Sequence, residues 1–408
     1  MNVLFVHNNF PGQFLHIARA LASGSQARIV AIGSSTAQKI KGIELSTYSI
    51  RDINLSETHP FARRFQIECH RAEQVLYLLS SLSRSGFVPD LIMAHPGWGE
   101  TLPLRTMFPN ARIVLYCEFF YGVQGRDVGF DPEFPETGAD AHVALHLKNA
   151  STLLALADCD SGISPTNWQR STFPKEYQDK ITTIHEGVNV DLVKPNPAAV
   201  FRLPSGRELH RSDEVVTFVA RSLEPLRGYH IFMRALPRIM AERPHAQIVV
   251  VGSEGASYGA PPPSDKTWKS IFFEEVVRQI DQKRLHFVGR LPYSSYLNAL
   301  QISSVHVYLT YPFVLSWSLL EAMSAGCLVI GSDTAPVREV LNNKNGLLVP
   351  FFDYEQLAGQ VIEALAYPRR FRSLRVQARQ TILDQYDLVR ICLPNVLRFI
   401  KKGIGPKA

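Results

Sequence analysis

The hydrophobic positions of this chain repeat one pattern, in which short apolar runs alternate with longer amphipathic segments. The runs lack polar alternation, which is typical of parallel strands that are covered on both faces. The amphipathic segments have the period of helices that cover such a sheet. The pattern pauses at a proline-bearing stretch near residues 190–205 and then restarts. It therefore predicts an α/β protein with two doubly wound, Rossmann-like domains that face a cleft.

The restart of the pattern places an N-terminal domain in residues 1–200 and a C-terminal domain in residues 201–385. Within the first domain, one helix is predicted over residues 141–160. Residues 386–408 are amphipathic with a basic end, which predicts a C-terminal helix. We expect this helix to cross back to the N-terminal domain, and contact with a membrane surface is the alternative.

The second domain is organised around residues 305–333. This stretch predicts a buried strand, a loop, a short helix that ends at Gly326, and a second buried strand. One acid, Glu321, lies within the otherwise apolar helix, and an unpaired carboxylate is costly to bury. Glu321 either accepts hydrogen bonds from the ribose of a bound nucleotide or only complements the dipole of its own helix.

Composition narrows the class of protein. The 408 residues are 46% hydrophobic and 20% charged, which indicates a soluble globular chain large enough for two domains. The net charge of +6 suits anionic ligands such as nucleoside diphosphates, or an anionic membrane face, and does not by itself indicate nucleic acid. Five scattered cysteines without CxxC spacing indicate buried thiols in a reducing cytoplasm, not disulfides or a zinc site. The chain has no signal-peptide pattern and no apolar window long enough to span a bilayer, so we expect a cytoplasmic protein.

Polar and glycine residues follow several predicted strands of the first domain, and ligand sites of α/β proteins lie at the carboxyl ends of parallel strands. Gly12 lies in the loop after the first strand, where a phosphate or sugar can approach the backbone, although a plain tight turn explains it equally well. His95 and Glu118 follow two later strands and are site candidates, although such residues also cap neighbouring loops.

Two further features of the first domain indicate contacts to an acceptor. An aromatic cluster, Phe119, Phe120 and Tyr121, directly follows a predicted strand. Arg63 and Arg64 open a basic helix face, which is either only solvated or contacts an anionic acceptor or lipid headgroups.

Two cations mark the carboxyl edge of the second domain's sheet. Arg221 ends a predicted strand, and Arg227 lies in the loop after it. Two guanidinium groups at this edge form a fork for a diphosphate, and two surface arginines without a ligand are the alternative. Together with a ribose-accepting Glu321, they describe a site for a nucleotide-linked donor.

Four segments carry a resemblance to a known family, namely ARSLEPLRG (220–228), LSWSLLEAMSAGCLVIGSD (315–333), HFVGRL (286–291) and VLFVHNNFPGQF (3–14). They resemble the donor-phosphate motif, the E-x7-E region, the nucleobase strand and the first glycine loop of the retaining glycosyltransferases of family 4 (glycosyltransferase group 1), which have the GT-B fold. The resemblance covers nearly the whole chain. It implies these donor-binding residues: Gly12, Arg221, Arg227, Gly252, Arg290, Leu291, Ser316, Trp317, Ser318 and Glu321.

Three positions depart from the family pattern. Arg227 stands where the family has a lysine and keeps the positive charge. Phe313 stands at the first acid of the E-x7-E motif and cannot accept a sugar hydroxyl, so sugar contacts are expected from backbone amides of residues 314–317 or from Ser316. Glu118 stands where the family often has a histidine near the reacting carbon. A carboxylate there stabilises positive charge on the sugar or orients the acceptor hydroxyl.

The resemblance implies a retaining hexosyltransferase that moves a sugar from a nucleotide-sugar donor to a glycan or lipid-linked acceptor, in surface polysaccharide or glycoconjugate synthesis. The expected catalytic residues are Arg221, Arg227, Glu118 and His95, with the arginines stabilising the departing diphosphate. No DxD-like motif follows a predicted strand, so neither a metal nor another cofactor is expected. We expect a cytoplasmic enzyme with peripheral contact at the inner membrane face.

Two other functions stay open at this point. A nucleotide-sugar epimerase of the same fold would need an acid/base pair beside the sugar, for which His95 and Glu118 are candidates. A catalytically silent nucleotide-sugar-binding protein is the other, because the first acid and the histidine of the family are both replaced. Release of nucleoside diphosphate in the presence of acceptors distinguishes the transferase from the silent protein.

Overall fold

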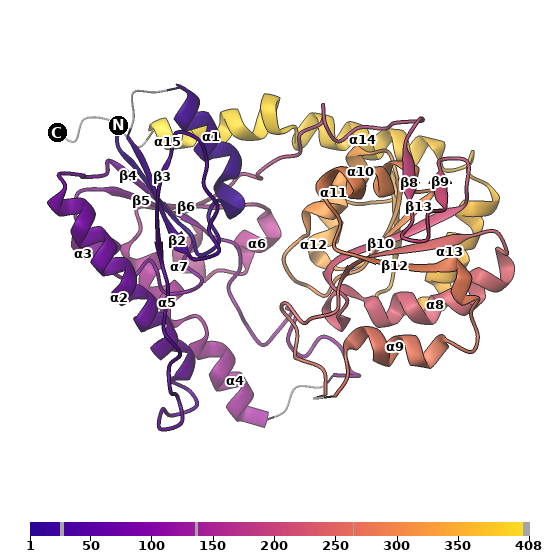
Figure 1. Ribbon diagram of the computed structural model, residues 1–408, viewed down its shortest axis with the longest axis horizontal. Helices are drawn as coiled ribbons and strands as arrows, with labels where there is room; N and C mark the ends of the chain where they lie inside the picture. Colours follow the sequence, from indigo (N-terminus) through magenta and orange to yellow (C-terminus); the bar gives the residue numbers. More distant parts are fainter. Residues whose placement is uncertain (25–27, 135–137, 264, 403–408) are drawn as a thin grey trace. The chain divides into compact units, whose positions relative to one another are not determined.

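The computed structural model describes residues 1–24, 28–134, 138–263 and 265–402. The chain forms two compact units (Figure 1). Unit 1 contains Met1–Glu186 and the segment from Val389 onward, and unit 2 contains Gly187–Leu388. The last part of the predicted C-terminal segment, residues 403–408, lies outside the described residues. Among the described residues, no helix combines the length and the apolar character needed to cross a bilayer.

Unit 1 is built on a parallel sheet with the strand order β3-β2-β1-β4-β5-β6-β7. Its strands are β1 (Val3–Val6), β2 (Ile29–Ser34), β3 (Glu44–Tyr48), β4 (Leu91–Ala94), β5 (Arg112–Tyr116), β6 (Ser161–Ser164) and β7 (Ile181–Thr183). Its helices are η1 (Gly12–Phe14), α1 (Leu15–Gly24), α2 (Arg63–Arg84), α3 (Leu104–Met107), α4 (Gly138–Leu147), α5 (Ala150–Asp158), α6 (Asn167–Ser171), α7 (Lys175–Gln178) and α15 (Leu393–Lys402). The strand order reverses at β1, which pairs with β2 on one side and β4 on the other. In doubly wound sheets, ligands bind outside the carboxyl ends of the strands at such a switch point.

Both faces of the unit 1 sheet are covered by apolar cores. Leu4 and Val6 of β1 lie in the core that contains residues of α2 and α5, whereas Val3 and Phe5 lie in the core that contains residues of α1 and α15. Side chains alternate between the faces of a strand, so a strand covered on both faces reads as a continuous apolar run. All four residues of β1 are 0% exposed, as that pattern predicts.

Unit 2 repeats this architecture with the strand order β12-β11-β10-β13-β14-β15, and β8 and β9 form a separate antiparallel pair. Its strands are β8 (Val200–Arg202), β9 (Glu208–His210), β10 (Val215–Ser222), β11 (Gln247–Ser253), β12 (Leu285–Gly289), β13 (Val305–Tyr308), β14 (Leu328–Ser332) and β15 (Leu347–Val349). Its helices are η2 (Pro225–Arg227), α8 (Tyr229–Glu242), α9 (Trp268–Val276), η3 (Gln282–Arg284), α10 (Tyr293–Ile302), α11 (Trp317–Ser324), α12 (Ala335–Arg338), α13 (Tyr354–Ala366) and α14 (Arg372–Gln385). The order reverses at β10, between β11 and β13. A π-helical turn, η4 (Leu388–Cys392), follows α14 in the chain.

The predicted class of two doubly wound parallel α/β domains is confirmed. The stretch at residues 305–333 forms β13, α11 and β14, in the predicted order. Gly326 follows α11 with a φ of +79°, the left-handed conformation that glycine adopts at helix ends.

The division between the units falls after Glu186, earlier than the boundary predicted after residue 200. The reason is that Val188, Val190 and Val193 are buried in an apolar core of unit 2, together with residues of α11 and α14. The proline-bearing stretch that marks a linker in the sequence is therefore anchored by valines at its beginning.

The sequence predicts one helix over residues 141–160, and the structure corrects this to two helices, α4 and α5. Asn149 lies at the break and is 1% exposed. Its Oδ1 accepts a hydrogen bond from the N–H of Tyr121, and its Nδ2 donates to the C=O of Tyr121, both at 2.9 Å. The side chain thus fixes the loop after β5, a long-range role that the local helical pattern does not reveal.

Gly228 offers a direct stability test of the turn between η2 and α8. Its φ is +69°, and a Cβ there would lie 2.3 Å from Cβ of Leu309, so Gly228→Ala adds a steric overlap to left-handed strain. We expect a loss of about 2–5 kcal/mol in the free energy of unfolding, measured by urea denaturation. Gly206 (φ +87°) has no atom within 4 Å of such a Cβ, so Gly206→Ala carries the strain alone and should cost about 1–2 kcal/mol. Equal losses in the two variants would contradict the packing described for Leu309.

Candidate functional site

Two arginines lie at the carboxyl end of β10, where the strand order of unit 2 reverses. The Cζ atoms of Arg221 and Arg227 lie 5.7 Å and 5.8 Å from the ring centroid of Tyr258. Nη1 of Arg221 also donates a hydrogen bond to the Tyr258 hydroxyl at 3.2 Å. The structure therefore brings both predicted donor cations together around one aromatic ring.

The two arginines differ in how they are held. Arg227 is buried, and its Nη1 donates to Oγ1 of Thr310 at 3.0 Å and to the C=O of Val314 at 2.9 Å. Its Cζ lies 5.6 Å from the ring centroid of Phe313, the residue at the position of the first motif acid. Arg221 is exposed and donates only to the tyrosine hydroxyl among the described residues, so its remaining N–H groups are available to a ligand.

Tyr258 is a site residue that the sequence analysis did not single out. Its loop is fixed by Glu224, which is 0% exposed and lies between the two arginines in the chain. Oε2 of Glu224 accepts hydrogen bonds from the N–H groups of Ser257, Tyr258 and Gly259 at 3.1, 3.4 and 3.1 Å. Three backbone donors on one carboxylate oxygen hold the loop against the arginine pair. The signal in the sequence was a lone acid inside the donor-phosphate motif, but nothing there indicates a partner 33 residues away.

Both carboxylate oxygens of Glu321 accept hydrogen bonds from tyrosines. The hydroxyl of Tyr293 donates to Oε1 at 2.6 Å, and that of Tyr296 donates to Oε2 at 2.7 Å. Burial raises the pKa of Glu321, and the two tyrosine hydrogen bonds oppose that shift. The partners that a buried acid requires are therefore present in unit 2 itself, and the ribose role of Glu321 stays a prediction. Tyr293 is 49% exposed, so the bond to Oε1 is the one that a ligand can replace.

The amino-terminal end of α11 is capped by its own serines. Oγ of Ser316 accepts hydrogen bonds from the N–H and the hydroxyl of Ser318, at 3.3 and 3.0 Å. The backbone N–H of Ser316 donates to the hydroxyl of Tyr308 at 2.8 Å, so this amide, expected to contact the sugar, has an internal partner. Trp317 is 50% exposed beside these groups.

The remaining predicted donor residues of unit 2 lie at neighbouring strand ends. Gly252 is in the last part of β11, where a Cβ would lie only 2.7 Å from the C=O of Ala220. Arg290 and Leu291 directly follow β12, and Arg290 is exposed. All of these strands are parallel, so these residues share the edge of the sheet that carries Arg221.

A second group of polar side chains lies at the switch point of unit 1. His7 follows β1, His95 follows β4, and Glu118 lies just beyond β5. Gln13 joins them, because its Nε2 donates to Oε1 of Glu118 at 2.8 Å and its Oε1 lies 2.7 Å from Nε2 of His7. Nε2 of His95 lies 3.4 Å from Oε2 of Glu118. We call these four residues the switch-point cluster.

The hydrogen bonds assign a tautomer to each histidine of the switch-point cluster. Nδ1 of His7 accepts from the N–H of Asn9 at 3.0 Å, and Nδ1 of His95 accepts from the N–H of Gly97 at 3.1 Å. The proton of each neutral ring is therefore on Nε2. His7 then donates to Gln13, and His95 donates toward Glu118, so both oxygens of Glu118 accept.

Burial and neighbouring groups determine which members of the switch-point cluster are charged. Burial, together with the nearby His95, lowers the pKa of His7 to about 4, although the hydrogen bond of Gln13 and the charge of Glu118 oppose this shift. Burial alone would raise the pKa of Glu118, but the hydrogen bonds and charge of His95, with the hydrogen bond of Gln13, lower it overall. At neutral pH, Glu118 is therefore a carboxylate and His7 is neutral.

Gly12 and Trp98 pack directly on the two histidines. A Cβ at Gly12, whose φ is +45°, would lie 2.5 Å from ring atoms of His7, so only glycine allows this ring under the loop. The indole of Trp98 stacks on His95 with centroids 4.2 Å apart. His7 and Trp98 were missed in the sequence, and the available signal was that His7 is the first polar residue after the first apolar strand.

The predicted acceptor aromatics do not share one environment. Phe120 is 8% exposed and lies in an apolar core of unit 1, so it supports the fold and is not available to an acceptor. Phe119 is half-buried, with its ring centroid 5.9 Å from that of Trp168. Tyr121 is also half-buried, and Nζ of Lys148 lies 3.5 Å from its ring centroid.

The predicted basic face at the start of α2 is partly engaged in the fold. Nε of Arg64 forms an ion pair with Glu68 at 2.8 Å, and its Nη2 donates to the C=O of Gly97 at 3.1 Å. Arg64 therefore ties α2 to the loop that carries His95. Arg63 is exposed and donates to the C=O of Thr58 at 3.1 Å.

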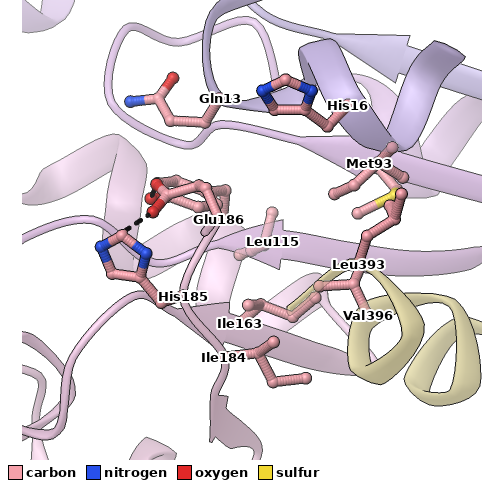
Figure 2. Close-up of a pocket in the computed structure, with 12 residues that line it drawn as sticks. Gln13, His16, Met93, Leu115, Ile163, Ile184, His185, Glu186, Leu393 and Val396 are labelled. Atoms are coloured by element: carbon pink, nitrogen blue, oxygen red, sulfur yellow. Dashed lines mark hydrogen bonds and ion pairs between the residues drawn. The ribbon is translucent and has the colours of Figure 1, made fainter. Parts of the chain in front are cut away.

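Gln13 is one of the residues that line a small cavity in unit 1 (Figure 2). Its volume is about 20 Å³, which is enough for a water molecule and far too small for a sugar. His185 and Glu186 line it, with Nε2 and Oε2 3.6 Å apart, and burial lowers the pKa of His185 to about 4. Leu393 of α15 closes another wall (Figure 2). The cavity is therefore too small to be a substrate site.

Comparison with known families matches both units. The model described as "Glycosyl transferase family 4 group" matches residues 25–193, and the one described as "Glycosyl transferases group 1" matches residues 213–367. This chain belongs to the family 4, group 1 glycosyltransferases.

Curated relatives of this glycosyltransferase chain match it in part. It is 24% identical over 224 residues to the D-inositol 3-phosphate glycosyltransferase of Segniliparus rotundus, covering 54% of this chain and 47% of that protein. It is 25% identical over 188 residues to the GDP-mannose-dependent monoacylated alpha-(1-6)-phosphatidylinositol monomannoside mannosyltransferase of Corynebacterium glutamicum, covering 43% and 45%. The matched part thus spans about half the length of these relatives.

Solved structures match the whole chain. Sucrose-phosphate synthase from Thermosynechococcus elongatus has a TM-score of 0.74 at 18% identity and covers 99% of both chains. Anabaena HepE in complex with UDP and glucose has a TM-score of 0.69 at 16% identity and covers 98% of this chain and 100% of that one. These likenesses confirm the GT-B fold.

The pKa of His7 gives a prediction for the stability of unit 1. The folded-state value of about 4 lies below the ordinary 6.5, so the unfolded chain takes up this proton first as the pH falls. The stability that neutral His7 contributes is present above pH 6.5 and is lost progressively between pH 6.5 and 4. In the wild type, we expect protonation linked to His7 to lower the free energy of unfolding by about 2 kcal/mol at pH 5 relative to pH 7.

The measurement is the free energy of urea unfolding at both pH values. His7→Gln should lose less stability on acidification than wild type, whereas the exposed His59→Gln should follow wild type. An equal pH dependence in all three proteins would show that His7 titrates normally in the folded state.

Proposed function

We propose that this protein transfers a hexosyl unit from a nucleoside diphosphate sugar to a glycan or lipid-linked acceptor, with retention of the anomeric configuration. The observation that carries the proposal is the convergence of Arg221 and Arg227 on Tyr258 at the switch point of unit 2. Two guanidinium groups, of which that of Arg221 is exposed and can donate paired N–H groups, provide the charge and geometry that a diphosphate requires. Membership in the glycosyltransferase family supports the same reaction class.

The similar proteins support either uracil or guanine as the nucleobase of the donor. The Anabaena structural neighbour was solved with UDP and glucose, and the Corynebacterium relative is named as GDP-mannose-dependent. We place the base beside Arg290 and Leu291, the diphosphate on the arginine pair, and the ribose at Glu321.

The proposed reaction forms a bond between the acceptor oxygen and the anomeric carbon and breaks the bond from that carbon to the phosphate oxygen. Negative charge develops on the departing diphosphate, and Arg221 and Arg227 are aimed at it before the reaction begins. Removing one such contact costs about 3–4 kcal/mol of transition-state stabilisation. The acceptor proton passes to the departing phosphate oxygen on the same face of the sugar. With two arginines on the diphosphate, we propose that neither a metal nor another cofactor takes part.

In this proposal, the switch-point cluster provides the charged and hydrogen-bonding groups of unit 1 that act on the sugar and the acceptor. An ionised Glu118 stabilises positive charge on the sugar, and the Nε2–H of His95 is a donor for a sugar or acceptor hydroxyl. Gln13 holds Glu118 in place. We propose that this cluster takes over the role of the histidine that the family often carries near the reacting carbon.

The acceptor is proposed to bind unit 1. Phe119 and Tyr121 are half-buried aromatic groups beyond β5, and the exposed Arg63 offers a cation to an anionic acceptor. Two of the curated relatives are named for phosphatidylinositol-linked substrates, which supports a lipid-linked acceptor and peripheral contact with the cytoplasmic membrane face. Surface polysaccharide or glycoconjugate synthesis is the corresponding process.

A silent nucleotide-sugar-binding protein is the second candidate. Phe313 packs against Arg227 at the position of the first motif acid, and Glu321 is occupied by two tyrosines. Such a protein binds the donor and releases no nucleoside diphosphate with any acceptor. An epimerase using His95 and Glu118 would instead change the sugar while it stays attached to the nucleotide.

Thermal stabilisation by UDP, GDP, ADP, CDP and dTDP in the presence of EDTA tests the donor site. One nucleotide at about 100 times its dissociation constant should stabilise wild type by about 2.7 kcal/mol. Arg221→Ala should bind about tenfold more weakly and lose about half of that stabilisation, because it removes a charge-assisted contact. Arg202→Ala, which removes an equally cationic but distant exposed side chain paired with Glu208, should behave as wild type.

Incubation of the identified nucleotide-sugar with glycan and lipid-linked acceptors then tests transfer. Release of nucleoside diphosphate and a product with the donor's anomeric configuration support the proposed reaction. Stabilisation without release favours the silent protein, and no stabilisation by any nucleotide would remove the donor site from Arg221. A shift that needs added divalent cation would contradict metal independence.

The Tyr293–Glu321 hydrogen bond gives a prediction for ribose binding. If ribose hydroxyls replace the Tyr293 hydroxyl on Oε1, wild type must break a hydrogen bond worth about 1 kcal/mol before it binds. Tyr293→Phe should therefore bind the nucleoside diphosphate about fivefold more tightly by isothermal titration calorimetry. The gain should vanish with the 2′,3′-dideoxy nucleotide, which has no hydroxyl for Glu321. Weaker binding by Tyr293→Phe would mean that the tyrosine itself contacts the ligand.

A further inference from the structure

A second basic surface of unit 2 lies apart from the donor residues. A cavity of about 510 Å³ opens along one side of α14, which is within the range of about 300–1,000 Å³ for small-molecule sites. Among the described residues that line it, none is acidic. Five are arginines, namely Arg211, Arg369, Arg372, Arg375 and Arg379. We call this feature the arginine cavity.

The three inner arginines of the cavity are bound to backbone carbonyl groups. Arg211 donates to the C=O of Ser303 at 2.9 Å, and Arg375 donates to the C=O of Ser304 at 2.8 Å. Arg379 donates to the last carbonyl of α11 at 2.6 Å. Cations at the carboxyl ends of helices are a common structural arrangement, so part of this charge is explained by the capping of α10 and α11.

The two outer arginines have no such explanation. Arg369 and Arg372 are exposed, and their side chains form no hydrogen bond or ion pair with any described residue. Their neighbour Arg370 differs, because it forms an ion pair with Glu363 and does not line the cavity. Nε of Arg375 is buried and has no hydrogen-bond partner among the described residues.

The cavity therefore concentrates positive charge, and none of the described residues that line it is acidic. Burial lowers the pKa of Arg375, and the charge of Arg211 lowers it further. Burial also lowers the pKa of Arg379, which Asp191 partly opposes. The amino-terminal end of α14 begins at Arg372 and adds the positive end of a helix dipole. An anion in this space would gain from every one of these groups.

We propose that the arginine cavity binds a ligand that carries two or more phosphate groups. Guanidinium groups bind phosphate through paired N–H donors, and the exposed Arg369 and Arg372 offer two such groups beside the positive charge of the three inner arginines. The volume also exceeds that of one phosphate and suits a larger polyanion. The ligand is either a soluble polyphosphorylated compound or the headgroup of a lipid with two phosphates. None of the cavity residues belongs to the donor site, so the proposal does not depend on the proposed function.

Isothermal titration calorimetry with inorganic tripolyphosphate is the first test. The informative variant is Arg369→Ala/Arg372→Ala, because neither side chain supports the fold through a hydrogen bond. We expect it to bind tripolyphosphate at least about tenfold more weakly than wild type. Arg278 is a further exposed arginine of unit 2 that does not line the cavity. The control Arg278→Ala/Arg370→Ala therefore removes the same charge outside the cavity and should bind as wild type. Circular dichroism spectra of both variants should match wild type.

The donor arginines also attract polyphosphates, so Arg221→Ala is titrated in parallel. If it retains the tight tripolyphosphate site that Arg369→Ala/Arg372→Ala loses, the cavity is a separate site whether or not the donor site is correct. If tight binding depends on Arg221 and not on Arg369 and Arg372, the proposal is overturned.

Flotation with vesicles identifies the source of the phosphates. Vesicles of phosphatidylcholine alone are compared with vesicles that also contain cardiolipin, which carries two phosphates. Cardiolipin-dependent binding that Arg369→Ala/Arg372→Ala loses and the control retains assigns a lipid headgroup. Tripolyphosphate binding without vesicle binding assigns a soluble ligand. The proposal is overturned if the protein shows no saturable tripolyphosphate binding and no cardiolipin-dependent flotation. It is also overturned if the control variant loses as much binding as Arg369→Ala/Arg372→Ala.

Discussion

Coverage of both faces of each parallel sheet is the constraint on which the rest of this protein depends. Strands such as β1, whose residues are apolar and 0% exposed, offer no side chain to a ligand along their length, so ligand-binding groups are expected at strand ends. The strand order reverses at β1 in unit 1 and at β10 in unit 2. The switch-point cluster and the arginine pair lie at the carboxyl ends of these two strands. The same constraint therefore forms the cores and positions the candidate chemistry.

Polar groups at these strand ends are held by partners far away in the sequence. Glu224 fixes the loop of Tyr258 through three backbone N–H groups, and Gln13 fixes Glu118 across unit 1. A buried carboxylate without such donors would destabilise the fold, so the partners are required for stability as well as for orientation. The position of each candidate catalytic group is thus set by residues that touch no reacting atom.

Arginine serves two distinct purposes in unit 2. Arg227 and the inner arginines of the arginine cavity donate to oxygens of the fold itself and stabilise loops and helix ends. Arg221 and the outer pair Arg369 and Arg372 are exposed, with most or all of their N–H groups available. The difference follows burial, because a buried guanidinium needs partners within the fold, whereas an exposed one can exchange water for a ligand. Arg227 has both roles in the proposed function, since it also lies with Arg221 around Tyr258.

The sequence alone determined the class of fold, the alternation of strands and helices in two domains, and the positions of Arg221, Arg227, His95 and Glu118 at or after strand ends. The reason is that a parallel sheet buried on both faces imposes a local pattern on every strand. Only the tertiary structure decided which residues meet. Tyr258 joins the arginines, two tyrosines occupy Glu321, and Asn149 divides one expected helix into two through contacts between distant segments. The sequence pattern also could not predict the burial of Phe120, since an aromatic residue that follows a strand has the same local pattern whether it packs in the core or contacts a ligand. Hydrophobic periodicity is a property of neighbours in the chain, whereas the partner of a polar group depends on loops whose paths the periodicity does not encode.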